Sequence, residues 1–116
     1  MTQDKELLLK DLCARLPYGV KVESVFINPD TKEHKSCGIE VFNATSILMI
    51  RDGLGEFKPY LFPISSMTEE QKEEWRGIRW SKLPWDELNW LNKGHWDYRH
   101  LIEKGLAIDA TGLNIY

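Results

Sequence analysis

Five tryptophans, the residue type best suited to recognition in this chain, all fall between Trp75 and Trp96. Four of them recur at intervals of five residues, which is not a helical period, so they cannot share one face of one continuous helix. Arg76, Arg79 and Lys82 are interleaved with the first of these rings, and no acidic residue lies between the three cations. The resulting strip is the candidate binding surface, and its nominated residues are Arg76, Arg79, Trp80, Lys82 and Trp85.

Aromatic rings beside cations allow three interpretations. They can bind nucleic acid by stacking on bases and contacting phosphates. They can form a protein interface, in which tryptophan is enriched, or they can fill a small core whose cationic rim reaches solvent. Trp80 falls in the connector before Pro84, and connectors run over the surface, so we expect it to be partly exposed. Trp75 and Trp90 are expected to be mostly buried.

A second group that could do chemistry is His95, Asp97 and His100. The spacing of the first two is typical of the start of a metal site built from two histidines and one carboxylate. In such sites the second histidine usually comes from a distant strand, whereas His100 follows five residues after His95. Asp97 also suits the simpler role of helix N-cap. We therefore expect structural roles and no metal or other cofactor, with the metal site kept as the alternative.

The two cysteines, Cys13 and Cys37, do not form a CxxC pair and are expected to be reduced structural thiols, Cys13 on the apolar face of a helix. Cys37 and His34 lie in an expected loop with no third group to orient them, so a catalytic pair is not expected there. Phosphate-loop, GxSxG and HExxH motifs do not occur in the sequence. An enzyme is therefore not expected.

The helices and strands that must position these residues are predicted from the spacing of apolar residues and from the prolines and glycines that end regular structure. Apolar spacing predicts a helix over 3–16, which Pro17 ends. From Val20 the period changes to two, which predicts a strand. Residues 31–36 are expected to form a loop, residues 38–43 and 46–51 a hairpin, and residues 56–62 an edge strand, because Pro59 and Pro63 cannot donate to a ladder.

The second half of the chain reads as helical. Capping boxes before Gln71 predict a helix to about Ile78, and Pro84 starts a second over 84–92. A third helix is expected from Asp97 to Lys104, ended by Gly105. The expected fold is α+β, with an N-terminal helix, a small antiparallel sheet or SH3-like partial barrel, and two to three C-terminal helices.

Composition fits one globular domain over residues 1–116, with 42% hydrophobic and 28% charged residues. The net charge is −3 with both signs well mixed, so general DNA binding is not expected. No apolar run reaches the 18 residues of a membrane helix, and the N-terminus does not read as a secretory signal. We therefore expect a cytoplasmic protein without a membrane partner.

Several phrases resemble a family of small uncharacterised proteins encoded by gut anaerobic bacteria and, often, by their prophages: residues 6–21, 58–61, 65–70, 97–99 and 101–107. The resemblance implies a mobile-element or accessory gene and supplies no catalytic residue.

The expected function is a non-enzymatic protein-interaction module. Its partner would be a protein of the host or of a mobile element, or a second copy of the chain in a homodimer. The alternative is a nucleic-acid-associated accessory protein that uses the strip near residues 75–85.

Overall fold

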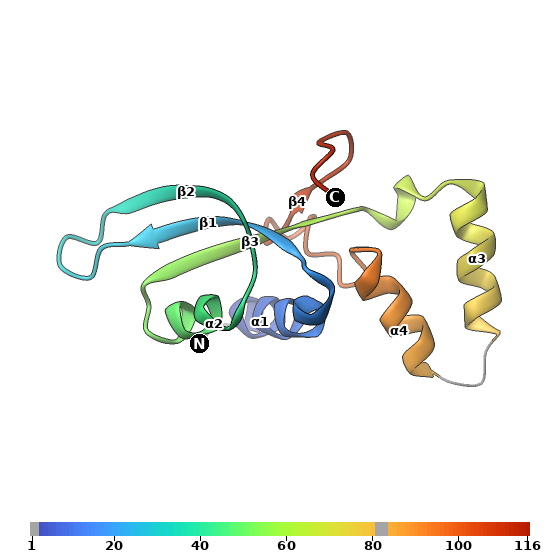
Figure 1. Cartoon of the computed structure of the whole chain (residues 1–116), viewed down its shortest axis with the longest axis horizontal. Coiled ribbons are helices and arrows are strands. Elements are labelled where there is room, and N and C mark those ends of the chain that lie inside the picture. The colour runs from blue at the N-terminus through green and yellow to red at the C-terminus, as the bar shows by residue number, and fades with distance from the viewer. Residues whose placement is uncertain (1–2, 81–83) are drawn as a thin grey trace.

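The chain has an α+β fold, as expected, and its computed structural model describes residues 3–80 and 84–116. Helices α1 and α2 lie on one side of a sheet, and α3 and α4 form a hairpin at one end of the molecule (Figure 1). In chain order the elements are α1 (Gln3–Arg15), η1 (Leu16–Tyr18), β1 (Lys21–Ile27), β2 (His34–Val41), α2 (Ala44–Arg51), β3 (Gly55–Leu61), η2 (Ile64–Ser66), α3 (Glu69–Arg79), α4 (Pro84–Lys93) and β4 (Ile108–Asp109).

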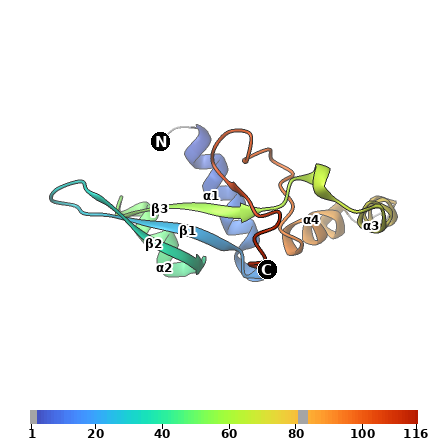
Figure 2. The ribbon, with the colours of Figure 1, turned by 90° about the horizontal axis from the view of Figure 1, so that it is seen from above.

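The sheet is mixed, with strand order β2-β1-β3-β4. β1 pairs antiparallel with β2 and with β3, whereas β4 pairs parallel with Tyr60 and Leu61 at the end of β3. The prediction of a purely antiparallel sheet is therefore wrong, because the short β4 pairs parallel to β3. An SH3-like barrel is not confirmed, because within the described residues no strand pairing joins β2 to β4. The view from above shows the long β1–β2 hairpin extending past the helices (Figure 2).

The predicted hairpin of 38–43 and 46–51 is wrong, because residues 44–51 form helix α2. Asn43 caps this helix: its side chain accepts from the backbone N–H of Ser46, and the Ser46 hydroxyl accepts from the N–H of Asn43. This reciprocal cap outweighs the β-branched composition of the segment. The partner of β1 is instead β2, which begins at His34, inside the stretch expected to be a loop.

The expectation that β3 is an edge strand is also wrong, since it lies between β1 and β4. Pro59 is nevertheless tolerated, because β4 pairs with Tyr60 and Leu61 alone and stops short of it. The side of β3 opposite β1 is therefore unpaired along most of its length, as a proline requires.

The third C-terminal helix does not form, and residues 97–104 make a series of turns. His100 adopts a left-handed φ of 57°, which ends any helix that Asp97 could begin. The expected end of this segment is confirmed: the N–H of Leu106 donates to Leu101 O and that of Gly105 to Ile102 O, the two bonds of a Schellman motif.

Two apolar clusters make up the core of the described residues. The larger lies between the sheet and helices α1 and α2 and contains Leu12, Val20, Val22, Phe42, Phe57, Leu61, Leu101 and Ala107. The smaller gathers Met67, Leu91 and Trp96 beside the helical hairpin. Val20, Val22 and Ser24 are buried, as the period of two predicts, but Cys13 is exposed rather than on the apolar face of α1.

Candidate functional site

The predicted binding strip lies at the end of the α3–α4 hairpin, on both sides of the connection between the two helices. Trp80 is the C-cap of α3, and its side chain is 87% exposed, which confirms the exposure expected of it. Arg76, Arg79 and Trp80 line a surface hollow of about 330 Å³. Trp85 is 58% exposed on α4, whereas Lys82 lies outside the described residues.

Two other tryptophans hold the hairpin together instead of presenting a surface. The indole N–H of Trp75 on α3 donates to Glu87 on α4 over 3.1 Å, and that of Trp90 on α4 donates to Glu74 on α3 over 2.9 Å. Each helix thus supplies one ring and one carboxylate to the other. Both rings are half-buried rather than mostly buried as expected, because each keeps one edge beside its surface carboxylate.

The cations of the strip are engaged by acidic side chains. Arg76 forms an ion pair with Glu73, and Arg79 Nε lies 3.7 Å from a carboxylate oxygen of Glu87. The Arg79 guanidinium also lies over the ring of Trp75, 5.3 Å from its centroid. These exposed pairs contribute little to stability, but they lower the positive potential available to a phosphate backbone.

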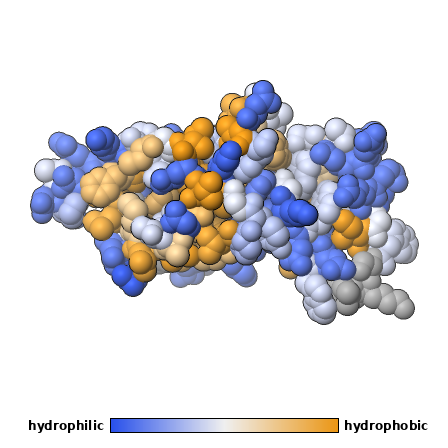
Figure 3. All heavy atoms as spheres, in the orientation of Figure 1, coloured by the Kyte–Doolittle hydropathy of each residue, from blue (hydrophilic) through white to orange (hydrophobic). Residues whose placement is uncertain are grey.

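The charge of the hairpin as a whole is close to balanced. Residues 69–93 contain six acidic and five basic side chains. Figure 3 shows a largely hydrophilic surface around α3. A surface with both signs interspersed has no strong positive field to attract a phosphate backbone.

Leu88 extends the exposed apolar surface of α4, although it is not among the residues named for the strip. It is 47% exposed, and it follows Trp85 by three residues, so the two share one face of the helix. Leu91 and Asn92 are buried instead and form the face that packs inward. The signal was present in the sequence, but which face of a short amphipathic helix is covered depends on tertiary packing.

The three metal candidates are held in separate structural roles. His95 is buried with its ring stacked on Tyr116, at 3.8 Å between centroids, and burial lowers its pKa to about 4. Asp97 accepts from the backbone N–H groups of Leu101 and Ile102, at 2.8 and 3.0 Å. His100 is exposed, with Nδ1 3.7 Å from Glu103. Across residues 3–80 and 84–116, no group of three or more His, Cys, Asp or Glu side chains could hold a metal ion.

Cys37 and His34 are oriented toward different partners. Cys37 is a β-bulge residue, skipped where the register passes from Ser24↔Gly38 to Val25↔Ser36, and its thiol faces the Lys35 carbonyl. His34 Nε2 lies 3.8 Å from Glu56 on β3. A bulge beside a lysine also protects the exposed edge of β2 from pairing with another chain.

No protein-family model, no curated protein and no solved structure matches this chain. Within the described part of the chain, no helix has the length and apolar character needed to span a membrane.

Proposed function

We propose that the protein is a non-enzymatic protein-interaction module whose partner docks on the end of the α3–α4 hairpin. We call this region the hairpin-tip surface and define it as Arg76, Arg79, Trp80, Trp85 and Leu88. Its partner would be a protein of the host cell or of a mobile element, since the family resemblance implies a mobile-element or accessory gene. The two would meet in the cytoplasm.

The observation that carries the proposal is the exposure of Trp80. A tryptophan is among the largest apolar side chains, and leaving it in water forgoes the free energy of burying its ring. Trp80 is 87% exposed, and two arginines line the hollow beside it. Tryptophan and arginine are the residues most enriched among those that dominate the binding energy of protein interfaces.

The apolar side chains of α4 extend the same surface. Trp85 and Leu88 are both about half exposed and lie on one helix face. The surface therefore combines an aromatic anchor, an apolar flank and arginines already close to carboxylates. That combination suits an apolar pocket with a polar rim on a partner protein better than it suits a row of phosphates.

The test is affinity capture from the cells that encode the protein, comparing the wild type with Trp80→Ala. Leu113→Ala is the matched control, because Leu113 is also exposed, at 47%, but lies in the C-terminal segment. We expect a protein that is retained by the wild type and by the control, and at least tenfold depleted with Trp80→Ala. Equal melting midpoints of the three proteins would exclude misfolding as the cause.

Two results would contradict the proposal. Retention of every bound protein by Trp80→Ala would remove the hairpin-tip surface as the docking site. Capture that is abolished by nuclease and falls steeply with salt would support the nucleic-acid alternative instead.

If the partner is a second copy of the chain, sedimentation equilibrium will detect a dimer in the wild type and a monomer in Trp80→Ala.

A further inference from the structure

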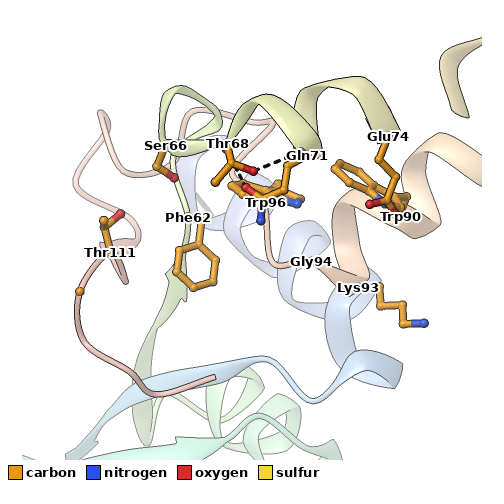
Figure 4. A pocket seen from close by; sticks show the side chains of 11 residues that line it. Phe62, Ser66, Thr68, Gln71, Glu74, Trp90, Lys93, Gly94, Trp96 and Thr111 are labelled. Carbon is orange, nitrogen blue, oxygen red and sulfur yellow. Dashed lines mark hydrogen bonds between the residues drawn. The ribbon is translucent and has the colours of Figure 1, made fainter. Parts of the chain in front are cut away.

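The C-terminal segment closes one side of a cleft that lies at the opposite end of α3 from the hairpin tip (Figure 4). The cleft has a volume of about 590 Å³, and its other walls come from the end of β3, the start of α3 and the end of α4. Thr111 and Gly112 line it from the C-terminal segment, and Figure 4 shows Thr111 and the ring of Phe62 at the same side. We call residues 111–116 the strap.

The strap is attached to the sheet through Ile115 and Tyr116. The Tyr116 hydroxyl accepts from the backbone N–H of Lys21 at the start of β1, over 2.9 Å, and donates to the carbonyl of Tyr60 on β3, over 2.7 Å. The Lys21 ammonium donates to the carbonyl of Ile115. Among the described residues, the other hydrogen bonds of the strap reach no farther along the chain than Asp109. Tyr116 is therefore the main contact that holds the strap closed.

The ring of Tyr116 covers a buried histidine. It stacks on the imidazole of His95, with 3.8 Å between the ring centroids and 14° between the ring planes. Tyr116 is 42% exposed and His95 only 8%, so the phenol ring separates one face of the imidazole from solvent. The Tyr116 ring also contacts Phe62, at 5.7 Å between centroids. Movement of the strap would expose both the imidazole and the Phe62 ring.

His95 lies among groups that disfavour its charged form. Burial, then the cations Arg15 on α1 and Lys21 on β1, lowers its pKa from 6.5 to about 4. The Nδ1 atom of His95 has no hydrogen-bond partner among the described residues. Because both ring nitrogens of an imidazolium are donors, a proton on this ring would leave a buried donor unsatisfied.

The acidic and phenolic groups around His95 are engaged by other partners. Asp97, in the same turn, accepts from two backbone N–H groups through its two carboxylate oxygens. Asp11 on α1 is shared between two arginines. Burial raises the pKa of both nearby phenols, Tyr60 on β3 and Tyr116 on the strap, so both are neutral. None of these groups offers a free negative charge to balance a proton on His95.

We propose that the strap is released by acid: it is closed while His95 is neutral, and it opens when His95 takes up a proton. Protonation places a third cation beside Arg15 and Lys21 and creates a donor that water must satisfy. A cation is attracted to the face of the Tyr116 ring, but this contact gives the imidazole N–H groups no oxygen acceptor. Lifting Tyr116 admits water to the imidazole. It also frees the Lys21 ammonium from Ile115, so the two cations can separate.

Opening of the strap changes the cleft as well as the histidine. Tyr116 no longer covers Phe62, so the cleft gains an exposed aromatic ring on the side that the strap had closed. Gly112 has a left-handed φ of 78°, which glycine adopts without strain, and it gives the strap a point about which to turn. The strap therefore couples pH to the shape of a cleft away from the hairpin tip, and this coupling does not rest on the proposed function.

Hydrogen exchange of the Lys21 amide measures the opening, because this N–H is bonded to the Tyr116 hydroxyl. With a His95 pKa of about 4 in the closed state and 6.5 in the open state, the ratio of open to closed molecules rises about seventyfold from pH 7.5 to pH 4.5. We expect the protection factor of this amide to fall at least tenfold. The Phe42 amide, bonded to Val20 O, reports unfolding of the sheet and should stay better protected than Lys21 at both pH values.

Variants test the coupling from both sides. Tyr116→Ala uncovers His95 and should raise its pKa toward 6.5, as measured by the pH dependence of the imidazole proton resonances. Leu113→Ala is the matched control, because Leu113 is an exposed residue of the same strap, and it should leave that pKa unchanged. His95→Phe keeps a ring for Tyr116 to stack on but cannot be protonated, so the protection of the Lys21 amide should change less than twofold over the same pH range.

Three results would overturn the proposal. Equal protection of the Lys21 and Phe42 amides at both pH values would mean that the strap opens only when the whole sheet unfolds. An unchanged His95 pKa in Tyr116→Ala would show that the strap does not keep this histidine neutral, and this measurement remains decisive if His95→Phe does not fold. An undiminished pH dependence of Lys21 protection in His95→Phe would assign the release to another group.

Discussion

At the residue scale, Gly94 sets the position of the Trp96 ring. A Cβ at this position would lie 2.4 Å from Trp96 Nε1 and 2.7 Å from its Cδ1, closer than any relaxed contact. Gly94→Ala must therefore move a buried indole. We expect a loss of about 1–3 kcal/mol in the free energy of unfolding, the usual cost of overpacking. Urea denaturation measures it.

Gly77 in α3 provides the matched control for this substitution. A Cβ there meets nothing within 4 Å, and the position is helical. Gly77→Ala should stabilise the protein by about 0.5–1 kcal/mol, because alanine restricts the unfolded chain and suits a helix. If both variants lose stability equally, contact with Trp96 is not what Gly94 accommodates.

His95 makes stability depend on pH. Burial, then Arg15 and Lys21, lowers its pKa in the folded protein from 6.5 to about 4. Between those values the unfolded chain binds more protons than the folded one, so stability must fall as pH falls through this window. Water at the edge of the ring screens part of the effect, and we expect a loss of about 1–2 kcal/mol between pH 7 and pH 5.

The control for this pH dependence is His95→Phe, which keeps a ring to stack on Tyr116 but cannot be protonated. Chemical denaturation at several pH values should give a shallower pH slope for this variant above pH 5. The same slope in both proteins would assign the effect to other groups.

At the scale of elements, α2 shows where sequence reasoning failed and why. The run from Ser46 to Arg51 is rich in apolar residues and short enough to be read as a strand. Its helical state depends on the reciprocal cap between Asn43 and Ser46, and on the packing of Ile47 and Ile50 against the larger cluster. Periodicity alone does not separate a short buried helix from a strand.

The Asn43 cap can be tested directly. Asn43→Ala removes the acceptor for the N–H of Ser46, so we expect it to cost about 1 kcal/mol, with reduced helical circular dichroism near the transition. Thr45→Ala, at an exposed position of the same first turn, should change stability by less than about 0.5 kcal/mol. Equal effects of the two would mean that the cap does not decide the state of this segment.

The sequence predicted correctly those elements for which the capping residue, the spacing of apolar residues and the helix-breaking residues all agree. Helix α1 ends close to Pro17, and helices α3 and α4 begin where Thr68 and Pro84 indicate; strand β1 lies where the period of two predicts it. The other elements depended on contacts between residues far apart in the sequence, which local patterns do not indicate. The left-handed His100 broke an expected helix, and β4 turned β3 into an inner strand.

In the candidate site, too, some features follow from local sequence and others depend on distant residues. The exposure of Trp80 followed from its place in a connector, which is a local property. The roles of Trp75 and Trp90 depend on carboxylates 12 and 16 residues away that a helical hairpin brings together. The contact between the Phe62 and Trp96 rings, 5.7 Å between centroids, joins residues more than thirty positions apart, so no local pattern indicated it.

At the scale of the whole molecule, the chain is elongated. Its radius of gyration is 15.2 Å and its extents are 52 × 29 × 22 Å, whereas a compact domain of this length has a radius of about 13 Å. The β1–β2 hairpin extends at one end and the α3–α4 hairpin at the other (Figure 1). The hairpin-tip surface therefore belongs to the helical end, and the contacts that attach this end to the sheet determine how rigidly that surface is presented.

A buried ionic network makes that attachment. Arg15 on α1 is fully buried, pairs with Asp11 over 2.9 Å and donates to the carbonyl of Trp96, a buried member of the smaller cluster. Arg99 pairs with the other oxygen of Asp11 over 2.8 Å, and both guanidiniums lie over the Tyr98 ring. One carboxylate thus balances two cations between the larger cluster and the smaller one.

The two members of this network should respond unequally to substitution. Asp11→Ala leaves both arginines without a carboxylate, so we expect a loss of about 3–5 kcal/mol in urea denaturation. Arg15→Met keeps the Asp11–Arg99 pair and removes a guanidinium whose Nη1 has no hydrogen-bond partner among the described residues, so its cost should be clearly smaller. The indole N–H resonance of Trp96 should shift in both variants, because the hydrogen bond to its carbonyl is lost or weakened. If Arg15→Met costs as much as Asp11→Ala, the bond from Arg15 to Trp96, rather than the balance of charge around Asp11, holds the helical end to the sheet.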